Sequence, residues 1–406
     1  MYHASFAPQL YSDFGEQDEY TIFSLWDIYR AAWQLYTLID PRAAGYAESL
    51  IDISQRTGRL PVWHLGGVET DCMVGVHSVP VLADAALKGL VDIDEAWEQV
   101  RKYPVQPADM VPGLEYIDSL GWLPADKVNW SVSRALEYCI DDAAAARLAM
   151  AAGDTAAASY HAERASLYRN YFKDGYMRGR LSDGSWRTPF DPSFSLHEEA
   201  DYIEGNAWQY TWLVPHDVEG LIGLFGGRKN FLDHLDALFA ADSELNEGAS
   251  ADITGMIGQY AHGNEPSHHV AYLYALAGEP WRTAELIRQI CAEFYSTAPD
   301  GLIGNEDCGQ MSAWYIFSAL GFYPVDPAGG YYVFGSPLCE EAVIRTVSGN
   351  DFRIVATGND EHNKYIGSVY LNGKPYDEPG ISHETIMKGG VLEFRMTSEP
   401  HNVNNR

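Results

Sequence analysis

The chain has 406 residues, of which 46% are hydrophobic and 13% aromatic, so it is long enough to bury a large core and to form two or three domains. Its formal net charge of −30 makes it a poor partner for nucleic acid or for an anionic membrane surface, and it contains no run of 18 apolar residues that would predict a transmembrane span. Its five cysteines are widely spaced without a CxxC pair, which argues against a disulfide framework or a thiolate zinc site.

Helical patterns dominate the chain as far as Gly321. Apolar side chains at positions 22, 25, 26, 29, 33 and 36 predict a first helix within residues 20–36. Long irregular connections are expected at 104–130 and 174–204. The other predicted helices cover 42–56, 72–89, 93–103, 131–151, 154–173, 206–213, 216–225, 228–240, 269–277, 280–296 and 311–321.

These helices, about twelve in all, are joined by alternately short and long connections. Such a pattern suits stacked helical hairpins, either closed into a ring or open as a solenoid. No sequence period of 30–50 residues is visible, which argues against a regular repeat array. A mainly α fold of the α/α-barrel type is therefore predicted, with functional loops on the rim that carries the long connections.

The pattern changes after Pro324, where short β-type runs replace the helices. Asn372-Gly373 is a tight hairpin signal between two of them. The sequence thus predicts a helical domain over 1–321, a small antiparallel β module over 322–400 and a disordered tail over 401–406. The predicted strands are 331–334, 341–345, 352–356, 368–371 and 391–396.

Three glycine-containing segments place carboxylates at loop-to-helix junctions. They carry Glu204, Glu265 and the pair Glu306-Asp307, and tryptophans follow two of them. In a barrel all three junctions would lie on the long-loop rim and face one cavity. Carboxylates among aromatic rings are typical of a sugar site, and two separated carboxylates can act as general acid and general base on a glycosidic bond.

Each segment also has a simpler interpretation. The acidic loop before residue 311 is of a kind that commonly caps a helix, Glu204 could be a first-turn acid, and Glu265 before a proline could start a helix. Adjacent His268 and His269 point about 100° apart on a helix and have no HExxH or CxxC companion, so zinc is disfavoured. The oxygen-rich loops suit Ca²⁺ better. Cys308 is discounted as a nucleophile because its sequence neighbours are carboxylates.

Four stretches together resemble glycoside hydrolase family 92. They are YTIFSLWDIYRAAWQL (20–35), YIEGNAWQYTW (202–212), HGNEPSHHVAYLYALAG (262–278) and GNEDCGQMSAWYIFSALGFYPV (304–325), and the end segment at 370–400 is similar as well. The resemblance covers nearly the whole chain. It implies a calcium-dependent, inverting exo-α-mannosidase with an (α/α)6 barrel, acting on mannose-containing oligosaccharides.

The same resemblance implies roles for individual residues. Glu204 would be the general acid and Asp307 the general base, with Glu306 in support. Asn305, a position where the family often has Asp, would also support the base and face the cation. Asn264 and Glu265 would hold the Ca²⁺, which is expected to bind the mannose O2 and O3. The residues expected to line the sugar subsite are Trp26, Asp27 and Trp208.

Family members carry an N-terminal β-sandwich domain. The first residues of this chain, in contrast, resemble an internal part of the family's sequence. The resemblance therefore implies that this domain is missing here or is supplied by a separate chain. A catalytically weak or inactive glycan-binding or assembly subunit is the main alternative function, and an inverting glycosidase for another sugar is a further one. The family suggests an exported or periplasmic protein, although the N-terminus lacks the basic start and apolar core of a signal peptide.

Overall fold

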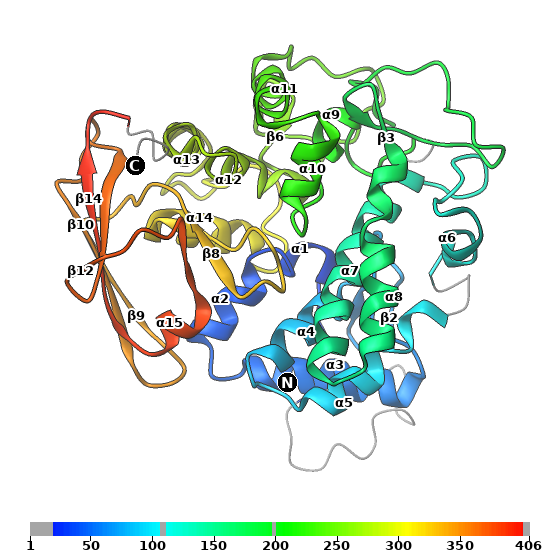
Figure 1. Ribbon diagram of the computed structural model, residues 1–406, viewed down its shortest axis with the longest axis horizontal. Helices are drawn as coiled ribbons and strands as arrows, with labels where there is room; N and C mark the ends of the chain where they lie inside the picture. The colour runs from blue at the N-terminus through cyan, green and yellow to red at the C-terminus, as the bar shows by residue number, and fades with distance from the viewer. Residues whose placement is uncertain (1–18, 106–110, 197–199, 401–406) are drawn as a thin grey trace. The chain divides into compact units, whose positions relative to one another are not determined.

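The structure is a computed structural model that describes residues 19–105, 111–196 and 200–400 (Figure 1). The predicted disordered tail, 401–406, lies outside these described residues. Within the described ranges the α-helices are α1 (Leu25–Ile28), α2 (Ala32–Ile39), α3 (Ala43–Thr57), α4 (Ser78–Leu87), α5 (Ile93–Val100), α6 (Leu114–Leu120), α7 (Ser131–Ala151), α8 (Thr155–Ala165), α9 (Ala207–Tyr210), α10 (Val218–Leu224), α11 (Arg228–Ala240), α12 (Leu273–Leu276), α13 (Pro280–Phe294), α14 (Gln310–Leu320) and α15 (His383–Met387).

Short 3-10 helices and strands complete the described chain. The 3-10 helices are η1 (Tyr103–Val105), η2 (Leu167–Tyr171), η3 (Glu265–Ser267) and η4 (Val270–Tyr272). The strands are β1 (His64–Leu65), β2 (Val68–Glu69), β3 (Phe172–Lys173), β4 (Tyr176–Met177), β5 (Met256–Ile257), β6 (Tyr260–Ala261), β7 (Phe322–Tyr323), β8 (Tyr331–Phe334), β9 (Glu341–Arg345), β10 (Asp351–Thr357), β11 (Tyr365–Leu371), β12 (Lys374–Pro375), β13 (Gly380–Ser382) and β14 (Gly390–Thr397).

The chain divides into two compact units, each made of segments that are not continuous in sequence. The first unit comprises the described parts of Met1–Tyr29, Arg42–His216 and Glu244–Ala251, and the second comprises those of Arg30–Pro41, Asp217–Ser243 and Asp252–Arg406. The structure is mainly helical and has small sheets near the end of the chain, as the sequence predicts. The closed (α/α)6 barrel and the domain boundary at residue 321 stay predictions.

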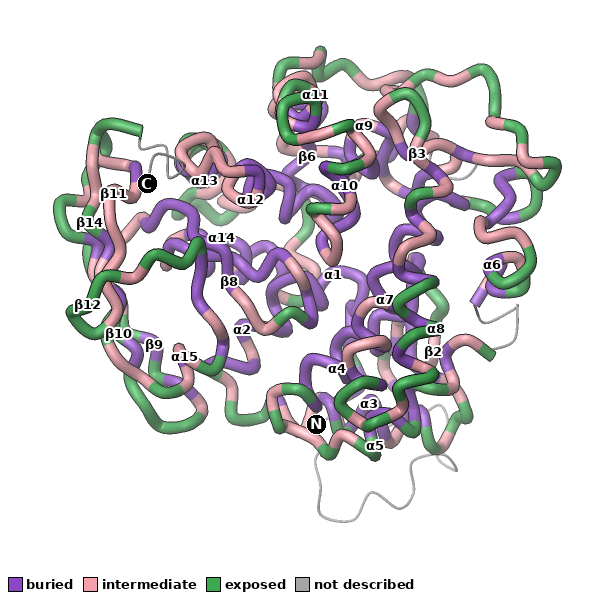
Figure 2. The backbone as a smooth tube through the Cα atoms, viewed as in Figure 1, coloured by how far each residue is buried: buried purple, intermediate pink, exposed green. Residues whose placement is uncertain are grey.

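The first unit is built on helices α4, α7 and α8. Helices α7 and α8 pack side by side, and α4 packs on α7 (Figure 1). Alanines on the inner face of α7, among them Ala135 and Ala145, are fully buried and allow this close approach. Every residue of α4 except Leu87 is buried (Figure 2). The prediction of a helix over 131–151 is confirmed, whereas the helix predicted over 154–173 ends at Ala165 and continues as η2.

One long helix was predicted within residues 20–36, and this prediction is wrong. The structure has two short helices, α1 and α2, because the chain bends between them and Ala31 takes the non-helical angles φ −152° and ψ −39°. The backbone N–H groups of Ala31 and Ala32 donate to Oε1 of Gln310 at 3.1 and 3.0 Å. A distant side chain therefore takes up two of the donors at the start of α2.

Other differences concern loops and short elements. The helix predicted from residue 72 starts only at Ser78, after a turn in which Asp71 and Met73 have positive φ. Helix α6 lies inside the stretch expected to be irregular, and the two-residue hairpins β1–β2, β3–β4 and β5–β6 were not predicted. A strand of only two residues is too short to show the alternation of polar and apolar side chains from which strands are predicted.

The second unit ends in two small sheets. The five-stranded sheet has the order β12-β11-β14-β10-β9 and the three-stranded sheet the order β13-β8-β7. All neighbouring strands are antiparallel, as predicted, except β10 and β14, which pair in parallel. Between these two strands the chain passes through β11, β12, β13 and α15, and β14 then enters the sheet between β11 and β10. The hairpin at Asn372-Gly373 is confirmed by the pairing of Leu371 with Lys374.

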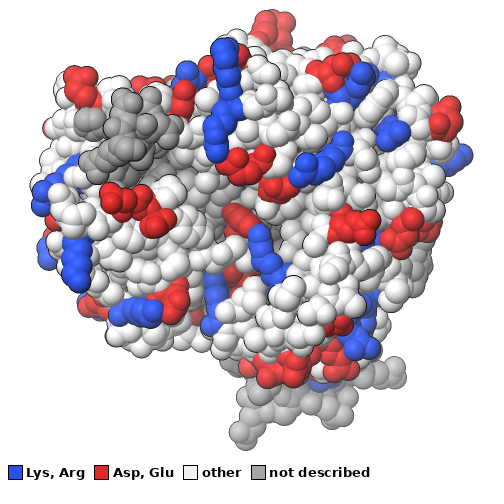
Figure 3. Space-filling model, viewed as in Figure 1, with Lys and Arg blue, Asp and Glu red and all other residues white. Residues whose placement is uncertain are grey.

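Acidic and basic side chains are interspersed over the face drawn in Figure 3. Among the described residues, none of the helices combines the length and the apolar character that a membrane crossing requires. All five cysteines are free thiols.

Candidate active site

In the second unit, glycines bring two acidic loops into contact. A Cβ atom on Gly304 would lie 2.5 Å from the carbonyl oxygen of Gly263 and 2.9 Å from its Cα atom, so no larger residue fits there without movement. Gly304 also has a φ of +76°, which favours glycine. This backbone contact places the segment with Asn264 and Glu265 next to the segment with Asp307.

The contact predicts a large effect for Gly304→Ala. We expect it to lower the free energy of unfolding by about 1–3 kcal/mol more than Gly330→Ala does, because both variants place alanine at positive φ but only Gly304 faces another backbone. Nothing lies within 4 Å of a Cβ atom on Gly330, whose φ is +61°. Urea unfolding of both variants measures the difference, and equal losses would show that the loops do not depend on this contact.

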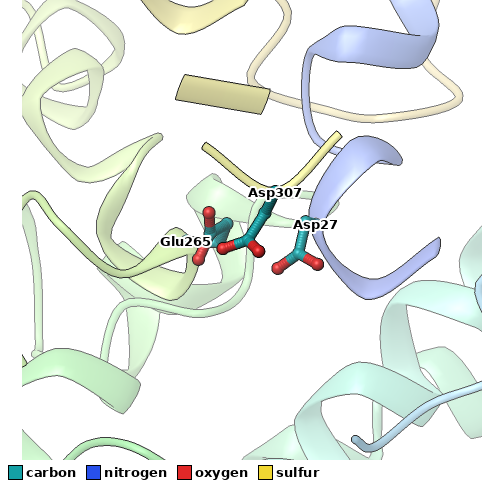
Figure 4. A group of neighbouring side chains, drawn as sticks. All are labelled: Asp27, Glu265 and Asp307. Atoms are coloured by element: carbon teal, nitrogen blue, oxygen red, sulfur yellow. The ribbon is translucent and has the colours of Figure 1, made fainter. Parts of the chain in front are cut away.

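Glu265 and Asp307 face each other across this contact. A carboxylate oxygen of Glu265 lies within 4.8 Å of one of Asp307, and Figure 4 shows the two groups turned toward each other. Glu265 is 1% exposed and Asp307 is half-buried. Burial raises the pKa of Asp307 above its ordinary value, and the negative charges of Asp252 and Glu306 raise it further. Such a group is suited to hold a proton or to stand beside a cation.

The rest of the acidic loop is held by hydrogen bonds. The carboxylate of Glu306 accepts the backbone N–H and the hydroxyl of Ser312 at 3.1 and 3.0 Å, so it caps the start of α14. The hydroxyl of Tyr36 donates to the carbonyl oxygen of Cys308 at 2.7 Å. Asp307 and Cys308 have positive φ values of 46° and 55°, which is an unfavourable backbone conformation for these residues. Surrounding contacts can stabilise such a conformation, and it is often found at functional sites.

Asp252 belongs to the same neighbourhood, although no sequence motif selects it. Its Oδ1 atom lies 3.4 Å from Nδ2 of Asn305, which donates to it. It stands 53 residues earlier in the chain, in a loop without helix or strand periodicity. Its contact with Asn305 and its effect on the pKa of Asp307 reveal it.

In the first unit, Glu204 lies just before α9. The start of this helix is capped by Asn206 and Gln209, whose side chains each accept the other's backbone N–H, at 3.3 and 2.8 Å. Glu204 lies outside the first turn, so the interpretation of Glu204 as a first-turn acid is wrong. Its φ is +48°, which is unusual for a glutamate.

Two other predicted residues of the first unit, Trp26 and Asp27, are buried. Asp27 is 1% exposed and accepts a hydrogen bond from the Ser24 hydroxyl, and Trp26 beside it is 3% exposed. The thiol of Cys72 is partly screened from water, which raises its pKa, and the negative charges of Glu204 and Asp27 raise it further. Glu204 and Asp27 therefore act on the same thiol.

Trp208 lies on α9, the helix that follows Glu204. Its indole ring meets the ring of Tyr176 edge-on, with 5.1 Å between the centroids, and it is only partly buried. This contact holds the indole in place while part of its surface stays accessible. An indole fixed in this way is suited to stack on the CH face of a sugar.

The ring of His268 is held by hydrogen bonds at both of its nitrogens. Both ring nitrogens of His268 are engaged, Nδ1 with the Gln310 amide at 3.0 Å and Nε2 with the carbonyl oxygen of His262 at 3.1 Å. Burial lowers the pKa of His268 to about 3, so its ring is neutral.

Comparison with known proteins identifies what the chain resembles. The model of the glycosyl hydrolase family 92 catalytic domain matches residues 1–398. An α-mannosidase of this family from Bacteroides thetaiotaomicron, solved in complex with mannoimidazole, is 39% identical and superposes with a TM-score of 0.90 over 96% of this chain and 52% of its own. A family 92 inverting mannosidase from the same organism is 33% identical, with a TM-score of 0.86 over 96% of this chain and 54% of its own.

A curated relative from Arthroderma benhamiae is named an uncharacterized secreted glycosidase. It is 28% identical, and the match covers 86% of this chain and 48% of the relative. The chain thus spans about half the length of each of these proteins. The matches agree with the family that the four sequence motifs resemble.

Proposed function

The chain belongs to glycosyl hydrolase family 92, and from this premise we propose that it is an exo-α-mannosidase that hydrolyses terminal α-mannosides of glycans with inversion at the anomeric carbon. Two similar structures are named as mannosidases, and one of these is named as inverting. The observation that carries the proposal is the pair of facing carboxylates Glu265 and Asp307, with the pKa of Asp307 raised.

Asp307 is the proposed general base. A base works best when its pKa lies nearer to the working pH than that of an ordinary aspartate, and burial beside Asp252 and Glu306 moves Asp307 in that direction. Asp307 would take a proton from the attacking water. Glu306 supports it in two ways, by its charge and by fixing the start of α14.

Glu204 is the proposed general acid, which would protonate the leaving glycosidic oxygen. Inversion in a single displacement requires the acid and the base to lie on opposite sides of the sugar ring, about 6.5–9.5 Å apart, so that a water fits. The left-handed backbone of Glu204 is the kind of strain that persists at functional sites. Trp26, Asp27 and Trp208 are proposed to line the sugar subsite.

Calcium is the proposed cofactor, held by Asn264, Glu265 and Asn305. These side chains offer carboxylate and amide oxygens, the donors that Ca²⁺ prefers, and the local excess of negative charge around Asp307 favours a divalent cation. When bound, Ca²⁺ would hold and polarise the 2- and 3-hydroxyls of the mannose. The protein's own contribution is the rigid pair of loops that fixes these oxygens in place.

Proton NMR of the reaction with a terminal α-mannoside tests the proposal. We expect the β-anomer of mannose to form first and then to mutarotate, because inversion of an α-mannoside gives the β-anomer. Matched α-glucosides, α-galactosides and β-mannosides should not react. The α-anomer as first product would rule out inversion, and cleavage of another sugar would indicate a different glycosidase. Binding of mannosides without cleavage would favour the glycan-binding or assembly subunit.

The site of action is proposed to be outside the cytoplasm. The support is the name of the relative from Arthroderma benhamiae, which describes that protein as secreted. Fractionation of the native host, with hydrolysis of an α-mannoside measured in each fraction, tests the location.

A further inference from the structure

A buried amide connects three separate segments of the second unit. Gln310, the first residue of α14, is fully buried. Its Oε1 accepts the backbone N–H groups of Ala31 and Ala32 at 3.1 and 3.0 Å, and its Nε2 donates to Nδ1 of His268 at 3.0 Å. All these contacts lie within the second unit.

These contacts fix both the orientation of the amide and the tautomer of the histidine. Two N–H donors can face only the oxygen of the amide, so its nitrogen must face His268. The neutral His268 ring then accepts at Nδ1 and donates from Nε2 to the carbonyl oxygen of His262 at 3.1 Å. Donors and acceptors are matched along the whole chain of hydrogen bonds from Ala31 to His262.

The chain of hydrogen bonds closes the loop that carries Glu265. His262 and His268 lie at its two ends, and the bond between them spans Asn264 and Glu265. The carbonyl oxygen of His268 also accepts the indole N–H of Trp314 on α14 at 2.9 Å. On the other side, the backbone N–H of Gln310 donates to the carbonyl oxygen of Asp307 at 3.3 Å. One residue thus contacts both acidic loops.

We propose that Gln310 is a positioning residue that holds the loop of Asn264 and Glu265 next to the loop of Asn305 and Asp307, and thereby sets the affinity of the cation site. The inference rests on the proposed function, because it takes the Glu265 loop as part of a Ca²⁺ site. Gln310 is not one of the proposed Ca²⁺ ligands. It acts through His268, since a loop held by matched hydrogen bonds keeps its oxygens in place without ligand.

The test compares four variants by calorimetric titration with Ca²⁺ alone, well below the unfolding temperature. Gln310→Leu and His268→Leu remove the hydrogen bonds while keeping much of the volume, and Gln310→Glu sets a carboxylate oxygen against the Nδ1 lone pair. We expect these three to weaken Ca²⁺ binding about 10–100-fold, as loss of an outer contact to a metal site typically does. His268→Gln retains one acceptor and one donor and should bind within about threefold of the wild type.

Gln289→Glu is the matched control, because it makes the same change on the exposed side of α13 and should leave the Kd unchanged. If Gln310 only fills space, the two leucine variants will bind Ca²⁺ like the wild type, and the proposal is wrong. It is equally overturned if all four variants bind alike. A wild type that binds no Ca²⁺ overturns both this inference and the proposed cofactor, whereas a wild type that binds and a Gln310→Leu that binds equally well overturns this inference alone.

Discussion

Replacing Glu204 by glutamine should abolish hydrolysis of mannosyl oligosaccharides while sparing a substrate whose leaving group needs no proton. Glutamine keeps the size and the hydrogen-bonding capacity of the side chain but cannot donate a proton as an acid. We expect kcat on a mannosyl disaccharide to fall about 10²–10⁴-fold, the usual contribution of a general acid. On dinitrophenyl α-mannoside, whose phenolate leaves unaided, the loss should be far smaller.

Asp307→Asn should behave differently, because the attacking water needs a base whatever the leaving group. We expect both substrates to lose rate by a similar factor, again about 10²–10⁴-fold. Steady-state kinetics on the two substrates separates the roles, with the exposed carboxyl variants Glu163→Gln and Asp300→Asn as controls for the change of charge in each unit. A Glu204→Gln variant that loses both substrates equally would contradict its role as the acid.

The sequence predicted the helical half of the fold well where the periodic segments are long. Helix α7 runs over the predicted 131–151, and α11 and α14 end where their patterns end. Long segments repeat their apolar period often enough to be recognised, and their caps are local. The side chain of Asp154 accepts a hydrogen bond from the start of α8, which marks where that helix begins. Gly321 has a left-handed φ directly after α14, which marks where that helix ends.

The failures come from contacts between residues far apart in the chain. The break between α1 and α2 depends on Gln310, almost 280 residues later, and no local propensity reports it. The parallel pairing of β10 with β14 is likewise a matter of topology. Strand propensity predicts where a strand lies but not which neighbour it takes.

The same limit applies to the candidate site. Glu265 and Asp307 could be selected from their motifs, but their mutual approach depends on the contact of Gly263 with Gly304, which only the structure reveals. Asp252 and Cys72 lie outside the quoted motifs, and Gln310 lies within one that does not point to a role for it. They are found through their neighbours, by a hydrogen bond or by an effect on a pKa.

Removing calcium should abolish hydrolysis and lower the temperature of unfolding. A cation bound only by the folded state stabilises it by about 2.7 kcal/mol at a concentration 100 times its Kd. We expect protein dialysed against EDTA to be inactive, Ca²⁺ to restore activity, and Zn²⁺ to fail because the loops offer oxygen donors. Glu265→Gln should raise the Ca²⁺ concentration required, while Glu293→Gln, exposed on α13, should not. Full activity in EDTA would rule out the cofactor.

The unfolding temperature of Asp307→Asn gives the sharper form of this prediction. Since burial and the charges of Asp252 and Glu306 raise the pKa of Asp307, its ionised form is disfavoured in the folded state. Without calcium, Asp307→Asn should therefore unfold at a higher temperature than the wild type, although it is inactive. With calcium this difference in unfolding temperature should shrink or reverse. The cation compensates the negative charge of Asp307 in the wild type, whereas the asparagine variant has no charge there to be compensated. A variant less stable than the wild type in EDTA would show that Asp307 serves the fold. The expected order would show that the acidic loop is kept for the cation and the reaction, at some cost to stability.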